Sequence, residues 1–456
     1  MNSKIIAMAA CLLGSAASAQ TSLDLPLSEA RSLAAEALFA GETGLALDIA
    51  RAILAQAPDD RDALAIVAAA APQQGDPRAG RIAGAQAYAL SQTNAQRYEA
   101  ARLTALAAAN EQRFTLGTFW LRRALIVAGS DEDRAQTRAD ARLLQQQNPW
   151  IFDIAATLAP SSNVNGGAAN NVASAPGNPT GTLSDDALAL AGWRGSLTLG
   201  ATYRLQENAT SRTLIGAQYQ AARVRITDDV DVPDEALATN VAELSLRHDR
   251  LLGNGSISGQ LAYTMVDYRD LDSVTLQTEV QKYDIWRVDI DRRLPLGDKA
   301  ELSLSLGRSW TEYDITRIGQ VTRTTLGSSL AYLLPNEDLV RATLIYGSSD
   351  GDNLNYTMTD WTAQFSYAIA DPVGPVTLAM AAGVTWADYP DYQLLLPVAG
   401  GRQDTSLFST LNIGFPQVSY AGFTPLLTIT ATTTDSNVSR FTRDALSAGL
   451  SIRSEF

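Results

Sequence analysis

Residues 192–205 read GWRGSLTLGATYRL, and this stretch decides the fold. Its apolar side chains share one parity and its polar side chains share the other: Trp193, Leu197, Leu199, Ala201, Tyr203 and Leu205 against Arg194, Ser196, Thr198, Thr202 and Arg204. Since side chains alternate between the two faces of a β-strand, this period of two predicts a strand with one apolar and one polar face. Residues 446–456 repeat the pattern and finish with Phe456 on the apolar face.

The alternation recurs from residue 148 to residue 456, where it predicts a transmembrane β-barrel domain. A soluble β domain would alternate in the same way, so the prediction depends on the connections. Short links are expected at 206–211, 251–255, 294–299, 335–338, 371–375 and 416–425, and longer ones at 161–191, 226–238, 269–278, 314–321, 347–357, 387–405 and 434–442. This spacing predicts about fourteen antiparallel strands, with short periplasmic turns and long outer loops.

The N-terminus has the features of a secretory signal peptide over residues 1–19. Lys4 precedes the apolar run 5–13, and Ala17-Ser18-Ala19 offers a small-residue cleavage site. The only cysteine, Cys11, lies inside this peptide, so the mature chain has no thiol for a disulfide or a metal site. Export together with a barrel predicts the bacterial outer membrane, with its lipid as a partner.

Residues 20–147 change to the helical period and to Ala, Leu, Arg, Glu and Gln. The helices come in pairs with a repeat of about 34 residues, which is typical of tetratricopeptide repeats. Ala34 and Ala46 stand where such a repeat needs small residues, Leu33 where it needs a large one, and Pro58 where it closes. The expected fold class is therefore α + β in two domains: an N-terminal tetratricopeptide-like helical solenoid in the periplasm, then the barrel. A plain helical bundle that braces the barrel is the alternative.

The composition argues against several kinds of chemistry. The formal charge of −14 argues against a nucleic-acid partner. His248 is the only histidine and is expected at the periplasmic rim, so we predict no enzyme activity and no cofactor. The acidic stretches 228–235 and 350–353 lack the spacing of an EF-hand, and we expect them to be solvated outer loops without a metal.

Charged residues of both signs occupy the polar parity of the expected strands. They are Arg194, Arg204, Arg212, Glu243, Arg247, Arg287, Asp289, Asp291, Arg341 and Arg453. An arginine that faces lipid at mid-depth costs about 2 to 4 kcal/mol, so these side chains are expected to face the lumen. Two interpretations stay open: the charges form a network that rigidifies the barrel, or they line a conduit for a polypeptide.

Two stretches carry a resemblance to a known family. Asn148-Pro149-Trp150-Ile151-Phe152 joins the two domains, and Ala159-Pro160-Ser161-Ser162-Asn163-Val164-Asn165 follows the first expected strand. Together with the helical repeats and the terminal Phe456, they resemble the Slam family, the surface lipoprotein assembly modifiers. That family commonly has an aspartate where this chain has Ser161.

The resemblance implies an outer-membrane translocator whose repeats engage a protein cargo in the periplasm, either a surface lipoprotein or a secreted scavenging protein. It also implies that Pro160, Ser162, Asn163 and Asn165 belong to a segment through which cargo enters the barrel or which gates it. The C-terminal Phe456 resembles the insertion signal that the barrel-assembly machinery reads. The alternatives are a polysaccharide exporter and a passive pore with a periplasmic helical anchor.

Overall fold

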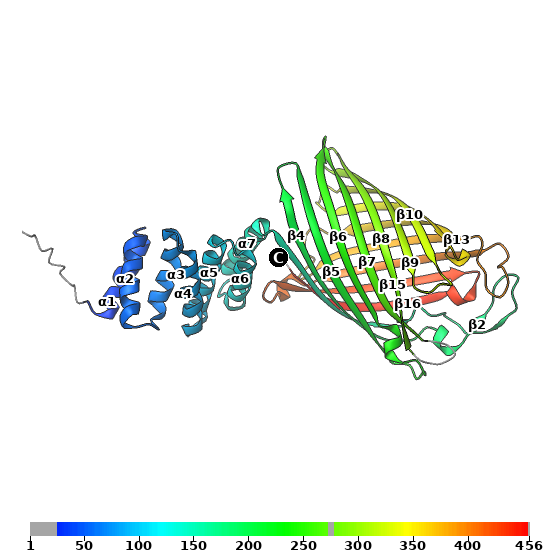
Figure 1. Ribbon diagram of the computed structural model, residues 1–456, viewed down its shortest axis with the longest axis horizontal. Helices are drawn as coiled ribbons and strands as arrows, with labels where there is room; N and C mark the ends of the chain where they lie inside the picture. Colours follow the sequence, from blue (N-terminus) through cyan, green and yellow to red (C-terminus); the bar gives the residue numbers. More distant parts are fainter. Residues whose placement is uncertain (1–24, 272–277, 455–456) are drawn as a thin grey trace, which may run out of the picture. The chain divides into compact units, whose positions relative to one another are not determined.

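The computed structural model describes residues 25–271 and 278–454. The predicted signal peptide, with Cys11, and the predicted insertion signal at Phe456 lie outside these residues. The chain divides into two compact units, Met1–Gln112 and Arg113–Phe456. We refer to the described part of the first, residues 25–112, as the repeat unit, and to residues 113–454 as the barrel unit (Figure 1).

The repeat unit consists of α-helices with one short 3-10 turn. They are α1 (Leu27–Phe39), α2 (Thr43–Gln56), α3 (Arg61–Ala70), η1 (Ala71–Gln74), α4 (Pro77–Leu90) and α5 (Asn94–Asn110). Three helices begin at side-chain caps that satisfy backbone N–H groups: Asp60 for α3, Asp76 for α4 and Thr93 for α5. The start of each of these helices is thus determined by the residue directly before it.

Alanine dominates the core of the repeat unit. Ala34, Ala46, Ala50 and Ala100 are fully buried in one cluster shared by α1 to α5, whereas Leu33 is 42% exposed. The two small repeat residues thus lie at helix contacts, whereas the large residue Leu33 faces outward. Because small side chains let helices approach closely, the unit depends on close helix contacts more than on bulky side chains.

Replacing Gly84 with leucine is expected to destabilise the repeat unit by about 1 to 3 kcal/mol, since inserted bulk strains a close-packed core. A Cβ at Gly84 would overlap the Thr104 hydroxyl of α5 and lie 3.3 Å from the Ala68 Cβ of α3. Thermal unfolding followed by circular dichroism measures the effect. Gly44→Ala is the control, because a Cβ there would meet nothing nearer than the Gln74 side chain at 4.0 Å. An equal melting temperature for both variants would refute the close-contact interpretation.

Two further helices, α6 (Phe114–Val127) and α7 (Asp131–Gln147), belong to the barrel unit. The change from helix to strand occurs where the sequence predicts it, since α7 ends at Gln147 and β1 starts at Trp150. The boundary between compact units instead falls after Gln112. Within the described chain, no helix is long and apolar enough to cross a bilayer.

Fourteen strands of the described chain close into one antiparallel barrel, as the sequence predicts (Figure 1). They are β1 (Trp150–Ser161), β4 (Gly192–Glu207), β5 (Ser211–Ile226), β6 (Thr239–Leu252), β7 (Gly255–Leu271), β8 (Thr278–Leu296), β9 (Ala300–Tyr313), β10 (Gln320–Leu333), β11 (Leu339–Gly351), β12 (Met358–Ala368), β13 (Thr377–Tyr389), β14 (Arg402–Gly414), β15 (Phe423–Ser436) and β16 (Arg443–Ser454). Each strand pairs with its sequence neighbours, and β1 closes the barrel between β4 and β16. The short pair β2 (Val172–Ala173) and β3 (Gly181–Thr182) lies in the segment between β1 and β4.

The barrel exterior is a belt of exposed apolar side chains. Leu197 and Leu199 of β4, Leu244 and Leu246 of β6 and Leu326 of β10 are all more than 40% exposed, and they alternate with polar residues that point to the other face. An apolar exterior around a closed barrel is the arrangement that places side chains in lipid and leaves no strand edge unpaired. The period of two read from residues 192–205 is therefore confirmed.

The predicted contrast between short and long connections is only partly right. The segments 162–191, 227–238 and 390–401 are long and lie at the end of the barrel where β1 finishes, which we refer to as the loop end. In contrast, β11 continues to Gly351 and leaves only 352–357 as a connection, no longer than the opposite turn 369–376. Strands extend here because backbone pairing continues beyond the apolar belt, through Ser348 and Ser349.

Candidate functional site

Strand alternation places the ten charged residues predicted for the lumen on the face opposite to the exposed apolar belt. On β8, Trp286 and Ile290 are about half exposed to the outside, so Arg287, Asp289 and Asp291 have the inward parity. The same count gives the inward parity to Arg194, Arg204, Arg212, Glu243, Arg247, Arg341 and Arg453. The structure brings five of these residues into two ion-pair networks.

The first network surrounds Asp249 at the turn end of β6. Arg212 Nε of β5 donates to Asp249 Oδ2 at 2.7 Å, and Arg247 Nε donates to Oδ1 at 2.8 Å. Arg247 Nη2 also donates to the Ser258 hydroxyl of β7 at 3.0 Å. One carboxylate thus joins two arginines across three strands, although Asp249 was not among the residues singled out from the sequence.

The second network links β6, β7 and β8. Glu243 Oε2 accepts a hydrogen bond from the Thr264 hydroxyl at 3.0 Å. The same oxygen lies 3.4 Å from Arg287 Nη2, and Arg287 Nε lies 2.9 Å from Asp289 Oδ2. In contrast, Arg194, Asp291, Arg341 and Arg453 form no ion pair with another described residue. The wall of the lumen therefore combines neutralised charges with free ones.

Two more ion pairs face inward and were not predicted from the sequence. Arg323 Nη2 of β10 donates to Asp360 Oδ1 of β12 at 2.6 Å, across the space that Gly347 leaves on the intervening strand. Arg402 and Asp404 of β14 pair at 2.5 Å. The Arg402 guanidinium also lies against aromatic rings near the loop end, at 3.2 Å from the centroid of Phe441, 4.3 Å from that of Tyr389 and 5.3 Å from that of Tyr392.

A series of tyrosines runs around the inner wall near the loop end, from one strand to the next. The rings of Tyr268 and Tyr283 are 5.9 Å apart, those of Tyr283 and Tyr313 4.9 Å, and those of Tyr313 and Tyr356 5.8 Å. The first three tyrosines lie on β7, β8 and β9 with the inward parity, and Tyr356 lies in the connection after β11. Such rings present apolar faces with polar edges to whatever occupies the lumen.

Arg204 has a bracing role that its parity alone did not reveal. Its Nη1 donates to the Gln146 carbonyl at 2.9 Å and its Nη2 to the Asn148 carbonyl at 3.3 Å, and it also pairs with Glu207. The carbonyls at a helix C-terminus carry partial negative charge, which a guanidinium stabilises. Arg204 thus fixes the end of α7 to β4 and is not free to contact a passing ligand.

Helix α6 contacts the strands on the other side of the closing seam through Arg122. Its Nη1 donates to the Ala421 carbonyl at 2.9 Å and its Nη2 to the Ser454 hydroxyl at 2.8 Å, while the guanidinium lies 4.4 Å from the centroid of Phe423. A cavity of about 250 Å³ adjoins this contact and is lined by α6, α7, β1 and the ends of β15 and β16. Helix α6 thereby holds the last strand at its C-terminal end.

The seam between β1 and β16 is short. Within the described residues its pairing starts at Ala156 opposite Ile452, whereas the pairing of β1 with β4 starts at Trp150. Among the residues that the structure describes, those at 150–155 pair with β4 alone, which leaves a gap in the described part of the seam. The contact of Arg122 with Ser454 braces the end of β16 beside this gap.

The predicted gating segment forms a tight knot of hydrogen bonds at the loop end. Asn163 is 8% exposed, and its Nδ2 donates to the carbonyls of Gly167 at 2.9 Å and Asp444 at 3.1 Å. Asn165 Nδ2 donates to the Leu188 carbonyl at 2.7 Å. The two asparagine Oδ1 atoms accept from the Gly167 N–H, at 2.9 and 3.2 Å. We refer to this arrangement as the asparagine knot.

The neighbouring residues extend β1 and hold the knot to β16. Ser162 exchanges two hydrogen bonds with Leu446, one through its backbone N–H at 3.0 Å and one through its hydroxyl at 2.9 Å. Pro160 lies opposite Trp193, one residue before β1 ends. Pro160, Ser162, Asn163 and Asn165 therefore lie together, and they use their polar groups internally. Their role in gating stays a prediction.

The segment 162–191 is fastened to two other connections at the loop end. Ser174 and Ser439 exchange backbone and hydroxyl hydrogen bonds, and Asn178 exchanges two with Leu396. Ala175 packs against an apolar cluster formed by Tyr392, Val398 and Val438. The loop end is consequently a connected layer in which the predicted gate is one part.

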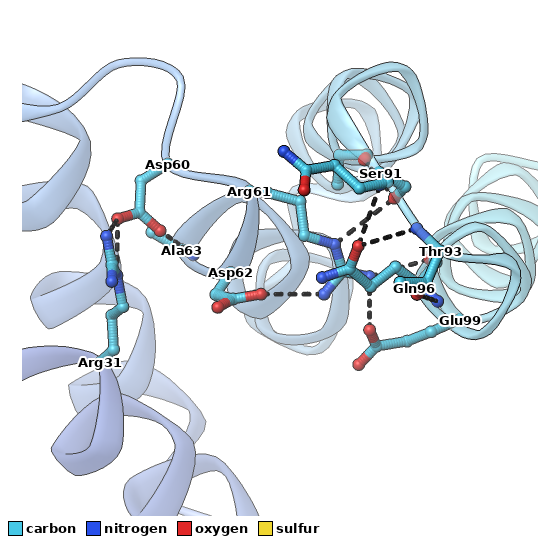
Figure 2. Close-up of polar contacts among 11 residues, drawn as sticks. Arg31, Asp60, Arg61, Asp62, Ala63, Ser91, Thr93, Gln96 and Glu99 are labelled. Atoms are coloured by element: carbon cyan, nitrogen blue, oxygen red, sulfur yellow. Dashed lines mark hydrogen bonds and ion pairs between the residues drawn. The ribbon is translucent and has the colours of Figure 1, made fainter. Parts of the chain in front are cut away.

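In the repeat unit, arginines connect each helix pair to the next (Figure 2). Arg31 of α1 forms an ion pair with Asp60 at 2.5 Å, Arg61 of α3 forms one with Glu99 of α5 at 2.5 Å, and Arg81 of α4 forms one with Glu111 at 2.5 Å. Arg61 also donates to the Gln96 carbonyl at 2.8 Å. These pairs join residues 29, 38 and 30 positions apart, so each spans about one repeat, as expected where successive helix pairs stack in a solenoid.

Asp60 is expected to make the repeat unit sensitive to acid. Burial raises the pKa of Asp60. The hydrogen bond from the Ala63 N–H and the Arg31 guanidinium together lower it by more than burial raises it, so the pKa lies below the ordinary value. A lowered pKa adds stability above the unfolded-state value of about 3.9 and loses it as the pH falls through the folded-state pKa. Asp60→Asn keeps the helix cap but removes the charge, so it should flatten the acid limb of a melting-temperature profile. An unchanged profile would contradict this assignment.

The other sites considered from the sequence serve local structure. His248 lies near the turn end of β6, where its Nδ1 is 2.9 Å from the Thr213 hydroxyl. Asp228, Asp234 and Asp352 each accept a hydrogen bond from a backbone N–H of a connection or strand end. Among the described residues no three acidic, histidine or cysteine side chains gather as a metal site would require.

Comparison with known proteins finds similarity in structure alone. No protein-family profile matches the sequence, and no curated protein matches it. Among solved structures, a loop-deletion mutant of OmpT from Vibrio cholerae is similar at 8% identity, covering 67% of this chain and 99% of that chain, with a TM-score of 0.34. CdiB from Acinetobacter baumannii is similar at 12% identity (66% and 60% covered, TM-score 0.36), and a bacterial polysaccharide outer membrane secretin at 13% (66% and 98%, TM-score 0.34). Similarity at these scores does not distinguish one barrel function from another.

The closed antiparallel barrel and its apolar exterior define the class of this chain: an outer-membrane β-barrel with an N-terminal helical region.

Proposed function

We propose that this chain is an outer-membrane translocator that moves a protein cargo, a surface lipoprotein or a secreted protein, from the periplasm to the cell surface. The repeat unit receives the cargo, the lumen passes it, and the layer at the loop end controls release. In this proposal the loop end faces the outside and the repeat unit lies in the periplasm. The resemblance of residues 148–152 and 159–165 to the Slam family supports the same role.

The observation that carries the proposal is the character of the inner wall. Arg212 and Arg247 share the carboxylate of Asp249, and Arg323 pairs with Asp360, so charges of both signs alternate and do not form a continuous track of one sign. A pathway selective for a charged solute would gain from such a track. A polypeptide carries charges of both signs, and a wall of largely paired charges neither holds nor repels it strongly.

A second candidate, passage of a glycan, is favoured by the tyrosine series Tyr268, Tyr283, Tyr313 and Tyr356. Aromatic faces suit the apolar faces of sugar rings, and the rings lie where an exported chain would leave the lumen. A passive pore remains the third alternative.

A comparison of surface proteins in cells with and without this gene, by limited surface proteolysis and mass spectrometry, tests the proposal. We expect one or a few proteins to leave the surface or medium and to accumulate in the periplasm. An unchanged protein profile with altered surface glycan would favour the second candidate, and altered small-solute uptake alone would favour the pore.

A chain that lacks residues 25–112 sharpens this test, since the cut falls at the boundary of the compact units and leaves α6 and Arg122 in place. Cargo display is expected to be lost while the barrel still inserts, as judged by the heat-dependent mobility of folded barrels on gels. Undiminished display would show that the repeat unit does not receive the cargo.

A further inference from the structure

Two arginines at the loop end point away from the lumen. Arg223 and Arg225 lie on β5 at the outward parity of Ile215 and Tyr219, and both are exposed. Arg223 is held in place, because its Nη1 donates to the Ala222 carbonyl at 2.7 Å and its Nη2 to Asn240 Oδ1 at 3.0 Å. Neither arginine forms an ion pair with a described carboxylate. Two cations thus face the membrane side of the barrel without an acidic partner among the described residues.

An apolar groove starts beside these arginines. It has a volume of about 660 Å³ and is lined by Leu158, Trp193, Gly195, Arg223, Val224, Arg225 and Thr227. Gly195 pairs with Leu158 on one side and with Arg223 on the other, so the missing side chain leaves the floor of the groove open on the outer surface. Trp193, 44% exposed, stands opposite Arg225.

We propose that this groove and the two arginines bind an acyl lipid with an anionic phosphate headgroup, from the leaflet that surrounds the loop end. An acyl chain lies against Gly195 and Leu158, and the phosphate contacts Arg223 and Arg225. The proposal rests on the orientation given under the proposed function only for the identity of the leaflet. The site lies outside the lumen and is independent of any cargo.

The chemistry of the groove favours a lipid over a soluble ligand. The groove joins an apolar part, lined by Leu158, Trp193 and Val224, to the two arginines, and it opens on the lipid-facing surface. A soluble anion would leave the apolar part without a partner. Guanidinium groups form paired hydrogen bonds with phosphate oxygens. Tryptophan marks the depth of the headgroup region in membrane proteins. Nearby Asp228 and Asp234 accept hydrogen bonds from backbone N–H groups and do not neutralise the arginines.

Native mass spectrometry of the full chain in a mild detergent tests this proposal, with diphosphorylated lipid A as the probe. A basic residue near an anionic membrane surface contributes about 1 kcal/mol, so each arginine should contribute about fivefold and Arg223→Gln with Arg225→Gln about 25-fold in affinity. Gly195→Leu should also weaken binding, because its side chain fills the groove. Arg250→Gln is the matched control: Arg250 is an exposed, outward arginine at the turn end of β6, and affinity should be unchanged.

Three results would overturn the proposal. The first is equal lipid binding by the double arginine variant and the parent chain. The second is an equal loss in Arg250→Gln, which would show a general charge effect. The third is displacement of the lipid by excess inorganic phosphate, which would show a site for free anions. Heat-dependent gel mobility confirms that each variant is folded, and Gly195→Leu tests the groove separately if the double variant does not fold.

Discussion

Replacing Gly167 with valine is expected to release the segment 162–191 from the loop end, at a local cost of about 3 kcal/mol. A Cβ at Gly167 would overlap the Leu188 carbonyl and lie 2.6 Å from the Ala189 nitrogen. Both obstacles are backbone, which cannot rotate away as a side chain can. The Gly167 N–H would then leave Asn163 and Asn165, and the asparagine knot would lose its centre.

Limited proteolysis of the purified protein in detergent measures this release, because a detached 162–191 segment should be cut many times faster than in the parent protein. Gly181→Ala is the control in the same segment, since a Cβ there meets only the Ala173 Cβ at 3.9 Å. If valine at position 167 leaves the cleavage rate at the parent value, the asparagine knot does not hold the segment.

Replacing Arg122 with alanine is expected to loosen the end of β16 and with it the β1–β16 seam. The change removes the hydrogen bonds to the Ala421 carbonyl and the Ser454 hydroxyl, together with the contact on Phe423. Hydrogen bonds from charged groups contribute about 1.5 to 3 kcal/mol each when their partner is left unsatisfied. Within the described residues the seam pairs over only part of β1, so we expect the loss of this brace to be felt at the end of β16.

Hydrogen exchange of residues 447–454 reports this loosening, and we expect exchange at least tenfold faster in the variant. Arg142→Ala, an exposed arginine of α7, is the matched control and should exchange like the parent protein. Equal protection of β16 in the Arg122 variant and the control would mean that α6 does not brace the seam.

The strands could be predicted from the sequence because their signal is local. Leu197 and Leu199 alternate with polar neighbours within a few residues, and lipid on one side makes that alternation obligatory. The strand ends were harder, as at Ser348 and Ser349, where polar residues continue to pair beyond the apolar belt. Pairing there depends on the neighbouring strand, so the alternation of apolar and polar residues does not reveal it.

The sequence could predict which face of its strand each charged residue occupies, but not which residue it would pair with. Parity shows that Arg247 faces inward, but its pairing with Asp249, two residues away on the same strand, depends on how the side chains turn. The pair Arg323 and Asp360 spans three strands and requires their register. The bracing by Arg122 joins residues about three hundred positions apart, which no local pattern encodes.

Photo-crosslinking within the barrel tests most directly whether a polypeptide passes through the lumen. A photoreactive amino acid is placed at Ser329 or Thr343, inward residues joined by a 3.2 Å hydrogen bond, and at the adjacent outward residues Leu330 or Leu344. We predict cargo-sized protein adducts at positions 329 and 343 in cells that contain the repeat unit, and none at 330 and 344. Adducts that are absent from the inward positions, or equal at both pairs, would contradict a protein pathway through the barrel.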